Sequence, residues 1–140
     1  MPPRPAIERF FCRLPRSMGG LTNLGRWVDH VSKVLRLSAS AEYAFRLCVE
    51  EAVSNVVIHG GDATDGQQTI AVRLKARPDT LFISIDDPCA PFDPVSGPLP
   101  DLQADLPGGH GLRLMRRFAC SIRYRRLNDR NQLMLIVARA

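Results

Sequence analysis

The sequence predicts a single-domain α/β fold, and three observations lead to that prediction. Short segments of alternating apolar and polar residues occur near the N terminus and again in the second half, as in strands that bury one face. Two longer segments between them carry apolar residues three and four positions apart, as amphipathic helices do. The chain has 140 residues, of which 45% are hydrophobic, so a single domain over residues 1–140 can bury one core without disulfides or a structural metal.

One strand and two helices are expected in the first half of the chain. Alternation predicts a strand over residues 8–14, and Gly19-Gly20 predicts a loop after it. An amphipathic helix follows over residues 21–37. A second helix, capped by Ser38 or Ser40, runs to about His59 and stops at the two glycines that follow.

The second half predicts two strands, a long loop, a helix and a hairpin. The strands cover residues 69–76 and 80–87, with a turn sequence between them. Residues 88–111 are rich in proline and glycine, and a loop of that length is usually a lid or disordered. A helix over residues 110–119 then leads into a hairpin whose strands cover residues 121–127 and 132–137.

The net charge of +5 raises the possibility of nucleic-acid binding. Aromatic residues do not alternate with the arginines as in a stacking platform for bases, so we expect no direct nucleic-acid partner. An acidic protein or the phosphates of a nucleotide would explain the charge equally well. The arginines that crowd the C-terminal part are Arg113, Arg116, Arg117, Arg123, Arg125, Arg126 and Arg130.

The four cysteines lie far apart, with no Cys-x-x-Cys pair and no histidine at ligand spacing. We therefore expect reduced thiols, mostly buried, in a cytoplasmic protein. The N terminus, Met-Pro-Pro-Arg-Pro, has no long apolar stretch, so the sequence predicts neither a signal peptide nor a membrane span. The cysteines are Cys12, Cys48, Cys89 and Cys120.

Glu51 and Asn55 are the most informative pair in the chain, because an apolar helix does not need them. Four residues is slightly more than one helical turn, so both side chains lie on one face. Their oxygens suit Mg²⁺, and a carboxylate can also act as a base toward a hydroxyl. For an isolated pair, an ordinary exposed helix face would be the favoured interpretation.

Two further motifs follow, each weak by itself. Asp86-Asp87 ends a buried strand, where a carboxylate can accept a hydrogen bond from a ligand's amine; an ordinary Asx-type turn is the alternative. Gly108-Gly109-His110-Gly111-Leu112 enters a helix, where backbone amides can approach phosphate oxygens. An ordinary helix-entry loop is the alternative there.

Taken in order, the three motifs resemble the N box and the glycine boxes of the GHKL ATPase superfamily. Glu51-Ala-Val-Ser-Asn55, Pro91-Phe-Asp-Pro94 and Gly109-His-Gly-Leu112 look like the anti-sigma-factor serine kinases of the RsbW/SpoIIAB type. Tyr124 and the segment that begins at Asn131 are also similar to that family. The resemblance covers nearly the whole chain and implies a two-layer sandwich, with a mixed, mostly antiparallel sheet and helices on one face.

The resemblance also implies roles for individual residues. Glu51 would be the catalytic base that activates a serine or threonine hydroxyl, and Asn55 would bind ATP and the metal, Mg²⁺. Asp87 would bind the adenine amino group; it fits the family spacing better than Asp86. The glycine segment, Gly108, Gly109, His110, Gly111 and Leu112, would form the ATP lid. Ser54 and His59 would support the site, although capping and packing explain them equally well.

The chain departs from the family pattern at Cys89, where the family has glycine two residues after the adenine-binding aspartate. A Cβ at this position is expected to crowd the nucleotide, because glycine serves where backbone and ligand come close. The glycine segment and the Glu51/Asn55 pair follow the pattern, so the sequence still favours an active enzyme.

The leading hypothesis is an ATP- and Mg²⁺-dependent protein serine/threonine kinase of a partner-switching system. It would phosphorylate a STAS-domain anti-sigma-factor antagonist and otherwise inhibit a sigma factor or similar target, and the resemblance implies a homodimer. The first alternative is a non-catalytic module of the same fold that sequesters a regulatory protein. A detached histidine-kinase catalytic domain is a weaker alternative because this helix carries Glu51, and nucleic-acid binding is the weakest.

Overall fold

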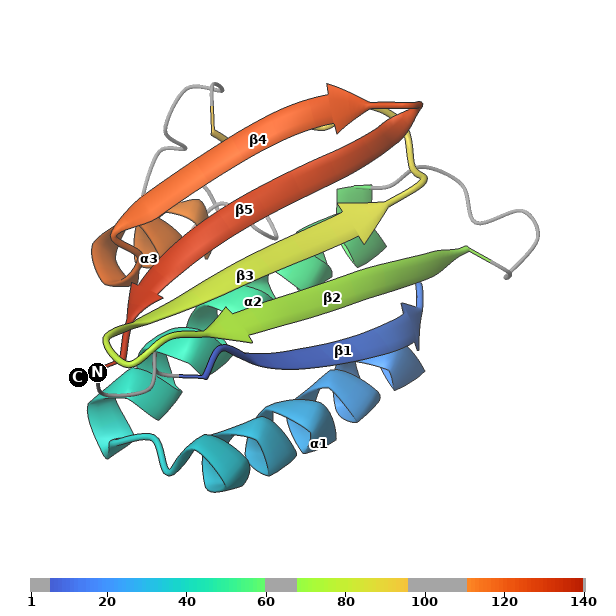
Figure 1. Ribbon diagram of the computed structural model, residues 1–140. Coiled ribbons are helices and arrows are strands. Elements are labelled where there is room, and N and C mark those ends of the chain that lie inside the picture. The colour runs from blue at the N-terminus through green and yellow to red at the C-terminus, as the bar shows by residue number, and fades with distance from the viewer. Residues whose placement is uncertain (1–5, 60–67, 96–110, 140) are drawn as a thin grey trace.

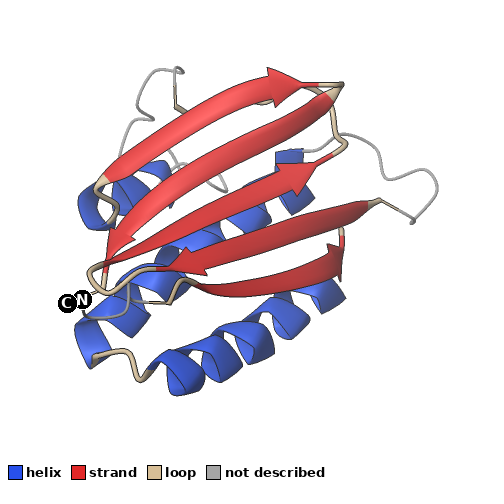
Figure 2. Ribbon diagram, in the orientation of Figure 1, coloured by secondary structure: helices blue, strands red, loops and turns tan. Residues whose placement is uncertain are grey.

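The computed structural model describes residues 6–59, 68–95 and 111–139, which form a two-layer α/β sandwich (Figure 1). A five-stranded sheet has the order β1-β2-β3-β5-β4, and the three described helices cover one of its faces (Figure 2). All four strand pairings are antiparallel. The predicted sandwich is therefore confirmed, and the mixed sheet expected from the resemblance has no parallel pair among the described strands.

The described residues form five strands and three helices in the order that the sequence periodicity predicts, with small shifts at the ends. The bounds, in chain order, are β1 Glu8–Pro15, α1 Met18–Leu35, α2 Ala39–His59, β2 Thr69–Ala76, β3 Thr80–Asp87, α3 Gly111–Phe118, β4 Ser121–Leu127 and β5 Arg130–Ala138.

The core lies between the helices and the inner face of the sheet. Phe45 of α2 is fully buried, and Trp27 of α1 packs edge-on against its ring at a centroid distance of 6.0 Å. These contacts hold α1 and α2 together over the sheet, which fixes the position of α2 for the site described below. Other core side chains are Leu24, Val28, Val31, Cys48, Val49, Val53, Ile70, Val72, Leu74, Leu81, Ile83, Ile85, Leu135 and Val137.

The loop expected at Gly19-Gly20 is wrong, because both glycines belong to the first turn of α1. Ser17 caps this helix by accepting a hydrogen bond from the Gly20 amide at 3.3 Å. The glycine at position 20 serves a different purpose from a turn: a Cβ there would lie 2.0 Å from the Pro15 carbonyl oxygen. Glycine thus permits the helix to start directly against the end of β1.

The β4–β5 hairpin is tighter than expected, with Leu127 paired to Arg130 and two residues between them. Those residues, Asn128 and Asp129, have φ values of 51° and 60°. Positive φ at both positions is typical of the two-residue turn whose twist matches antiparallel strands. The longer four-residue turn expected from the sequence is therefore replaced by a tight one.

No described helix is long and apolar enough to cross a membrane.

Replacing Gly20 by alanine is expected to destabilise the protein by about 2 kcal/mol, because the new methyl group forces α1 away from β1. Gly25 is the matched control: it lies in the same helix, and a Cβ there has nothing within 4 Å. Gly25→Ala should stabilise the protein by about 1 kcal/mol through helix propensity. Urea unfolding followed by circular dichroism measures both, and equal effects of the two substitutions would contradict the close-packing explanation.

Candidate functional site

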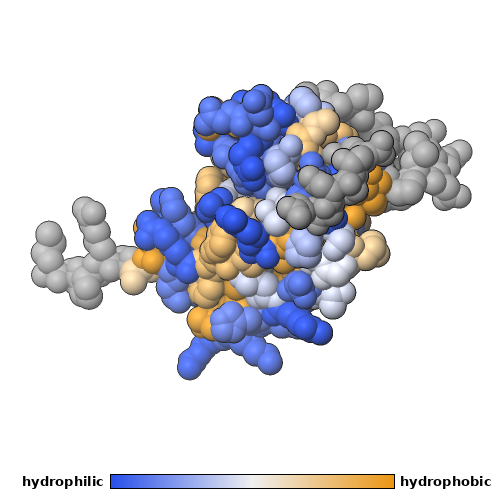
Figure 3. All heavy atoms as spheres, turned by 90° about the vertical axis from the view of Figure 1, so that its right-hand side faces the viewer, coloured by the Kyte–Doolittle hydropathy of each residue, from blue (hydrophilic) through white to orange (hydrophobic). Residues whose placement is uncertain are grey.

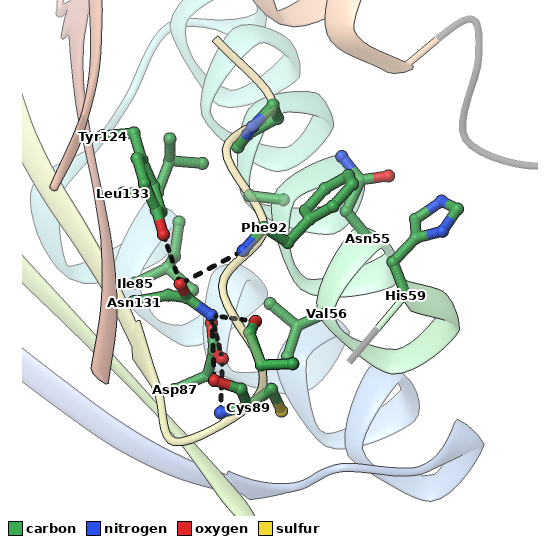
Figure 4. Close-up of a pocket in the computed structure, with 13 residues that line it drawn as sticks. Asn55, Val56, His59, Ile85, Asp87, Cys89, Phe92, Tyr124, Asn131 and Leu133 are labelled. Atoms are coloured by element: carbon green, nitrogen blue, oxygen red, sulfur yellow. Dashed lines mark hydrogen bonds between the residues drawn. The ribbon is translucent and has the colours of Figure 1, made fainter. Parts of the chain in front are cut away.

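A pocket lies between α2 and the sheet, at the end of the molecule where β3 finishes and β5 begins (Figure 4). Asn55 contributes to it from α2 and Asp87 from the end of β3, so the fold brings together two predicted site residues 32 positions apart. The other lining residues are Ala52, Val56, His59, Ile85, Cys89, Ala90, Phe92, Pro94, Tyr124, Asn131 and Leu133. Most of the wall is apolar, as in sites that enclose a planar ligand.

Asp87 is held rigidly in the pocket wall. Its side chain is buried, and its Oδ1 accepts hydrogen bonds from the Cys89 amide and from the Asn131 side-chain amide, both at 2.9 Å. Both bonds go to Oδ1 and neither goes to Oδ2. Asp87 therefore has a fixed orientation and a second oxygen that can accept a hydrogen bond from a bound molecule.

Asp86 lies on the opposite face of the sheet, where Arg130 and Gln132 hold its carboxylate. Successive strand residues point to opposite faces, so only one of the two aspartates can face the helices. The structure places Asp87 there, and the binding of adenine by Asp87 stays a prediction.

Asn131, which sequence reasoning noted only as part of a similar tail, is the centre of the polar network behind the pocket. It is 5% exposed. Its Nδ2 donates to Asp87 Oδ1 and also to the Ala90 carbonyl at 3.0 Å. Its Oδ1 accepts from the Tyr124 hydroxyl at 2.5 Å and from the Arg126 guanidinium at 3.1 Å. A single carboxamide thus joins two strands to the segment after β3 (Figure 4).

Arg126 also donates to the Cys89 carbonyl oxygen at 2.7 Å, which fastens the same segment from a second side. The arginine-rich hairpin therefore holds the segment after β3 in place, besides carrying surface charge. The sequence feature that indicates this role is the position of Asn131 at the start of an apolar strand. A carboxamide buried there needs hydrogen-bond partners.

Asn55 is 5% exposed, and its carboxamide forms no hydrogen bond with any described residue. Buried amides normally form hydrogen bonds. Because Asn55 forms none with a described residue, its carboxamide is available to bind a ligand or an ion. Glu51 lies one turn earlier on α2, is half-buried and does not line the pocket. Burial, with a smaller effect from neighbouring Glu50, raises the pKa of the Glu51 carboxyl.

The described residues contain no group of three or more His, Cys, Asp or Glu side chains able to hold a metal ion. Mg²⁺ often uses one or two protein oxygens and completes its shell with phosphates and water. The free, buried carboxamide of Asn55 fits such a role.

Cys89 is accommodated without backbone strain. A side chain is costly where φ is in the left-handed region. The described residues other than glycine with positive φ are Arg36, Asn128 and Asp129, so Cys89 lies outside that region. The thiol is 2% exposed and lines the pocket. Burial, followed by the charge of Asp87, raises the pKa of Cys89 to about 11, so the sulfur is a neutral thiol.

His59 and Phe92 stack on one another at the mouth of the pocket, with ring centroids 4.9 Å apart and planes 16° from parallel. The sequence did not predict this pair. Behind it the open space has a volume of about 30 Å³, room for about two water molecules. A purine needs more room, so its entry requires side chains at the mouth to move.

The glycine segment can be placed only in part. Gly108, Gly109 and His110 lie outside the described residues, whereas Gly111 starts α3 and Leu112 follows it. The Met115 side chain of α3 is fully buried in the core, and Arg116 donates a hydrogen bond to the Val95 carbonyl oxygen at 2.6 Å. The last turn of α3 is thereby tied to Val95, which follows the pocket residue Pro94. Figure 3 views the end of the molecule where β3 finishes and β5 begins, and hydrophilic side chains gather there above and below a mixed middle region.

A comparison with known protein families shows to which family this chain belongs. The model of the histidine kinase-like ATPase domain, HATPase_c_2, matches residues 15–137, which is most of the chain. This chain belongs to the histidine kinase-like ATPase family. The resemblance to serine kinases of this superfamily is also confirmed: a curated relative, serine/threonine-protein kinase BtrW of Bordetella bronchiseptica, is 35% identical over 114 residues. That match covers 78% of this chain and 79% of the relative.

Solved structures agree on the fold of this ATPase-family chain. The RsbU and RsbW domains of a Mycobacterium tuberculosis protein match with a TM-score of 0.63 at 14% identity, over 95% of this chain and 33% of the other. The chain thus spans about a third of that two-domain structure. The histidine kinase domain of a blue-light-activated kinase from Erythrobacter litoralis matches with a TM-score of 0.53, also at 14% identity, over 89% and 61%. Both likenesses confirm the GHKL fold.

Removing the side-chain amide of Asn131 is expected to loosen the whole pocket wall. Asn131→Ala should destabilise the protein by about 2 kcal/mol, since Asp87 and Tyr124 lose partners in a buried place. Tyr124→Phe, which removes a single hydrogen bond from the same network, is the matched control and should cost about 1 kcal/mol. Unfolding in urea gives both values; an Asn131→Ala protein as stable as Tyr124→Phe would show that Asn131 is not the centre of the network.

Proposed function

We propose that this protein is an ATP- and Mg²⁺-dependent protein serine/threonine kinase that acts on a regulatory protein. The observation that carries the proposal is the convergence of Asn55 and Asp87, each with an unused oxygen acceptor, on one apolar pocket. Membership of the ATPase family and the 35% identity to a serine/threonine kinase support it. Adenine would lie against Asp87, and the phosphates would extend toward Asn55 and the glycine segment.

In this proposal Asn55 would hold Mg²⁺ through its carboxamide oxygen, and the ion would supply positive charge opposite the ATP phosphates. Glu51 accepts the proton of the serine hydroxyl as that oxygen attacks the γ-phosphorus and ADP leaves. The raised pKa of Glu51 suits a base, because a carboxylate that is poorly solvated holds a proton more strongly. Gly108, Gly109, His110, Gly111 and Leu112 would close over the phosphates as a lid.

The proposed substrate is a STAS-domain antagonist of an anti-sigma factor, and the proposed target of the unoccupied protein is a sigma factor or a similar regulator. The relation to kinases of the RsbW type supports both, together with a homodimer and a cytoplasmic location. Incubation with ATP, Mg²⁺ and each purified STAS-domain protein of the same genome tests the substrate, with phosphoserine located by mass spectrometry.

A non-catalytic module that sequesters its partner is the second candidate. The side chain of Cys89 in the pocket and the small open volume behind His59 and Phe92 favour it. Such a module would bind its partner with the same affinity whether or not ATP is present, and it would transfer no phosphate.

Glu51→Gln is expected to lower phosphotransfer at least 100-fold while leaving ATP affinity within about twofold, because the base acts on the hydroxyl and not on the nucleotide. Glu50→Gln, on the next residue of α2, is the matched control and should stay active. The same Glu51→Gln protein should be slightly more stable at neutral pH, since an ionised group with a raised pKa costs stability once pH exceeds that pKa. Full activity in Glu51→Gln would remove Glu51 from the mechanism.

The pH dependence of phosphotransfer should report the same carboxyl group. A base must be deprotonated, so the rate constant should fall as pH is lowered through the raised pKa of Glu51. Because the pKa is raised, this loss should begin at a higher pH than for an ordinary glutamate. Single-turnover rates from pH 4.5 to 8.5 measure the profile, and a rate that stays flat to the acid limit of folding would contradict it.

Cys89→Gly should tighten ATP binding by about tenfold if the Cys89 side chain crowds the nucleotide. Cys48→Ala provides a control, since Cys48 is equally buried but lies in the core away from the pocket. Titration calorimetry compares the two variants with wild type. Unchanged affinity in Cys89→Gly would show that the thiol does not limit binding.

A further inference from the structure

The face of the sheet opposite the helices is uncovered, and its side chains follow from the strand register. Phe11 of β1 pairs with Arg73, and Lys75 of β2 pairs with Arg9 on one side and Phe82 on the other. Cross-strand partners share a face, so these side chains all project from the same surface, here called the outer sheet face. Phe11 and Phe82 are 50% and 39% exposed, large values for phenylalanine in a sheet.

The outer sheet face is strongly basic. Its described acid is Asp86, whose carboxylate is already held by Arg130 and Gln132. Arg9 and Lys75 stand directly opposite each other, an arrangement of like charges that destabilises a sheet unless an anion lies nearby. The cations of this face are Arg9, Arg13, Arg73, Lys75, Arg123, Arg125 and Arg130. Of these, only Arg130 forms an ion pair with a described carboxylate.

A groove crosses β1, β2 and β3 on this face between Phe11 and Phe82, with an open volume of about 460 Å³. Arg9, Arg73 and Lys75 also line it. The groove thus combines an apolar floor with a cationic rim, separate from the pocket that holds Asn55 and Asp87. It is large enough to take an aromatic or aliphatic side chain together with part of its backbone.

The arrangement around Phe11 points to a protein and not to nucleic acid. Arginine guanidinium groups lie 5.9 Å (Arg13) and 5.1 Å (Arg73) from the centre of the Phe11 ring. These cation–π contacts occupy the ring surface on which a base would stack. A second copy of the chain is disfavoured as well, because facing copies would bring two sets of seven cations together.

We propose that the outer sheet face docks a protein partner through an acidic segment whose apolar side chain enters the groove between Phe11 and Phe82. The charge complementarity steers the partner, and the groove supplies contact area. This goes beyond the proposed kinase activity, since it concerns a second surface and needs neither ATP nor phosphotransfer. The two proposals can therefore fail separately.

The test uses a fluorescein-labelled 12-residue peptide of aspartate and glutamate with one central phenylalanine, and fluorescence anisotropy without nucleotide. Wild type should bind it at micromolar concentration, and raising salt from 50 to 300 mM should weaken binding several-fold. The double variant Arg73→Glu/Lys75→Glu should weaken binding at least tenfold. Arg26→Glu/Lys33→Glu, with the same charge change on exposed positions of α1, should bind within about twofold of wild type.

Phe82→Asn separates the groove from charge alone and should weaken binding about fivefold with no change of net charge. Circular dichroism checks that each variant is folded. Three results would each overturn the proposal: no binding by wild type, equal losses in both charge-reversal variants, or tighter binding of a 12-nucleotide oligothymidylate that Arg73→Glu/Lys75→Glu abolishes. The last result would assign the face to nucleic acid.

Discussion

The hydrogen bonds of Asn131 are the interaction on which the rest of the site depends. This one carboxamide fixes the Asp87 carboxylate, the segment after β3 and the Tyr124 hydroxyl at the same time. Because it is buried, each of its bonds is made without competition from water, and each partner would be unsatisfied without it. The pocket wall is therefore set by strand β5, which lies far from the nucleotide motifs in the sequence.

The antiparallel sheet supplies the framework in which this network can form. Asp87 pairs with Asn131 at the last position of the β3–β5 ladder, so the backbone register already brings the two side chains together. Helix α2 packs across the same strands through a fully buried stripe and brings Asn55 to the opposite wall. An apolar cleft with two polar groups is the result, and of these Asp87 is fixed by hydrogen bonds.

Much of the fold could be predicted from the sequence because periodicity decides it. The alternation in β2 and β3 and the three- and four-residue spacing in α1 and α2 are local properties, and they placed those elements to within a few residues. Gly19-Gly20 misled this reasoning, because a glycine needed for close helix–strand contact looks the same in sequence as a glycine needed for a turn. Asn55 and Asp87 were singled out by their spacing and strand-end position, and the resemblance of motifs then implied their roles. Asn131 was not predicted as part of the site, and His59 was predicted to support the site without its stacking on Phe92, since their partners come from other elements and leave no short pattern.

We propose that the pocket binds Mg²⁺-ATP through Asn55. Titration calorimetry on wild type and Asn55→Ala, with and without Mg²⁺, tests it most directly, and Ser54→Ala on the same helix is the control. We expect micromolar binding by wild type that requires Mg²⁺ and persists in Ser54→Ala, with a loss of at least tenfold in Asn55→Ala. Absence of binding by wild type, or equal affinity in Asn55→Ala, would contradict it.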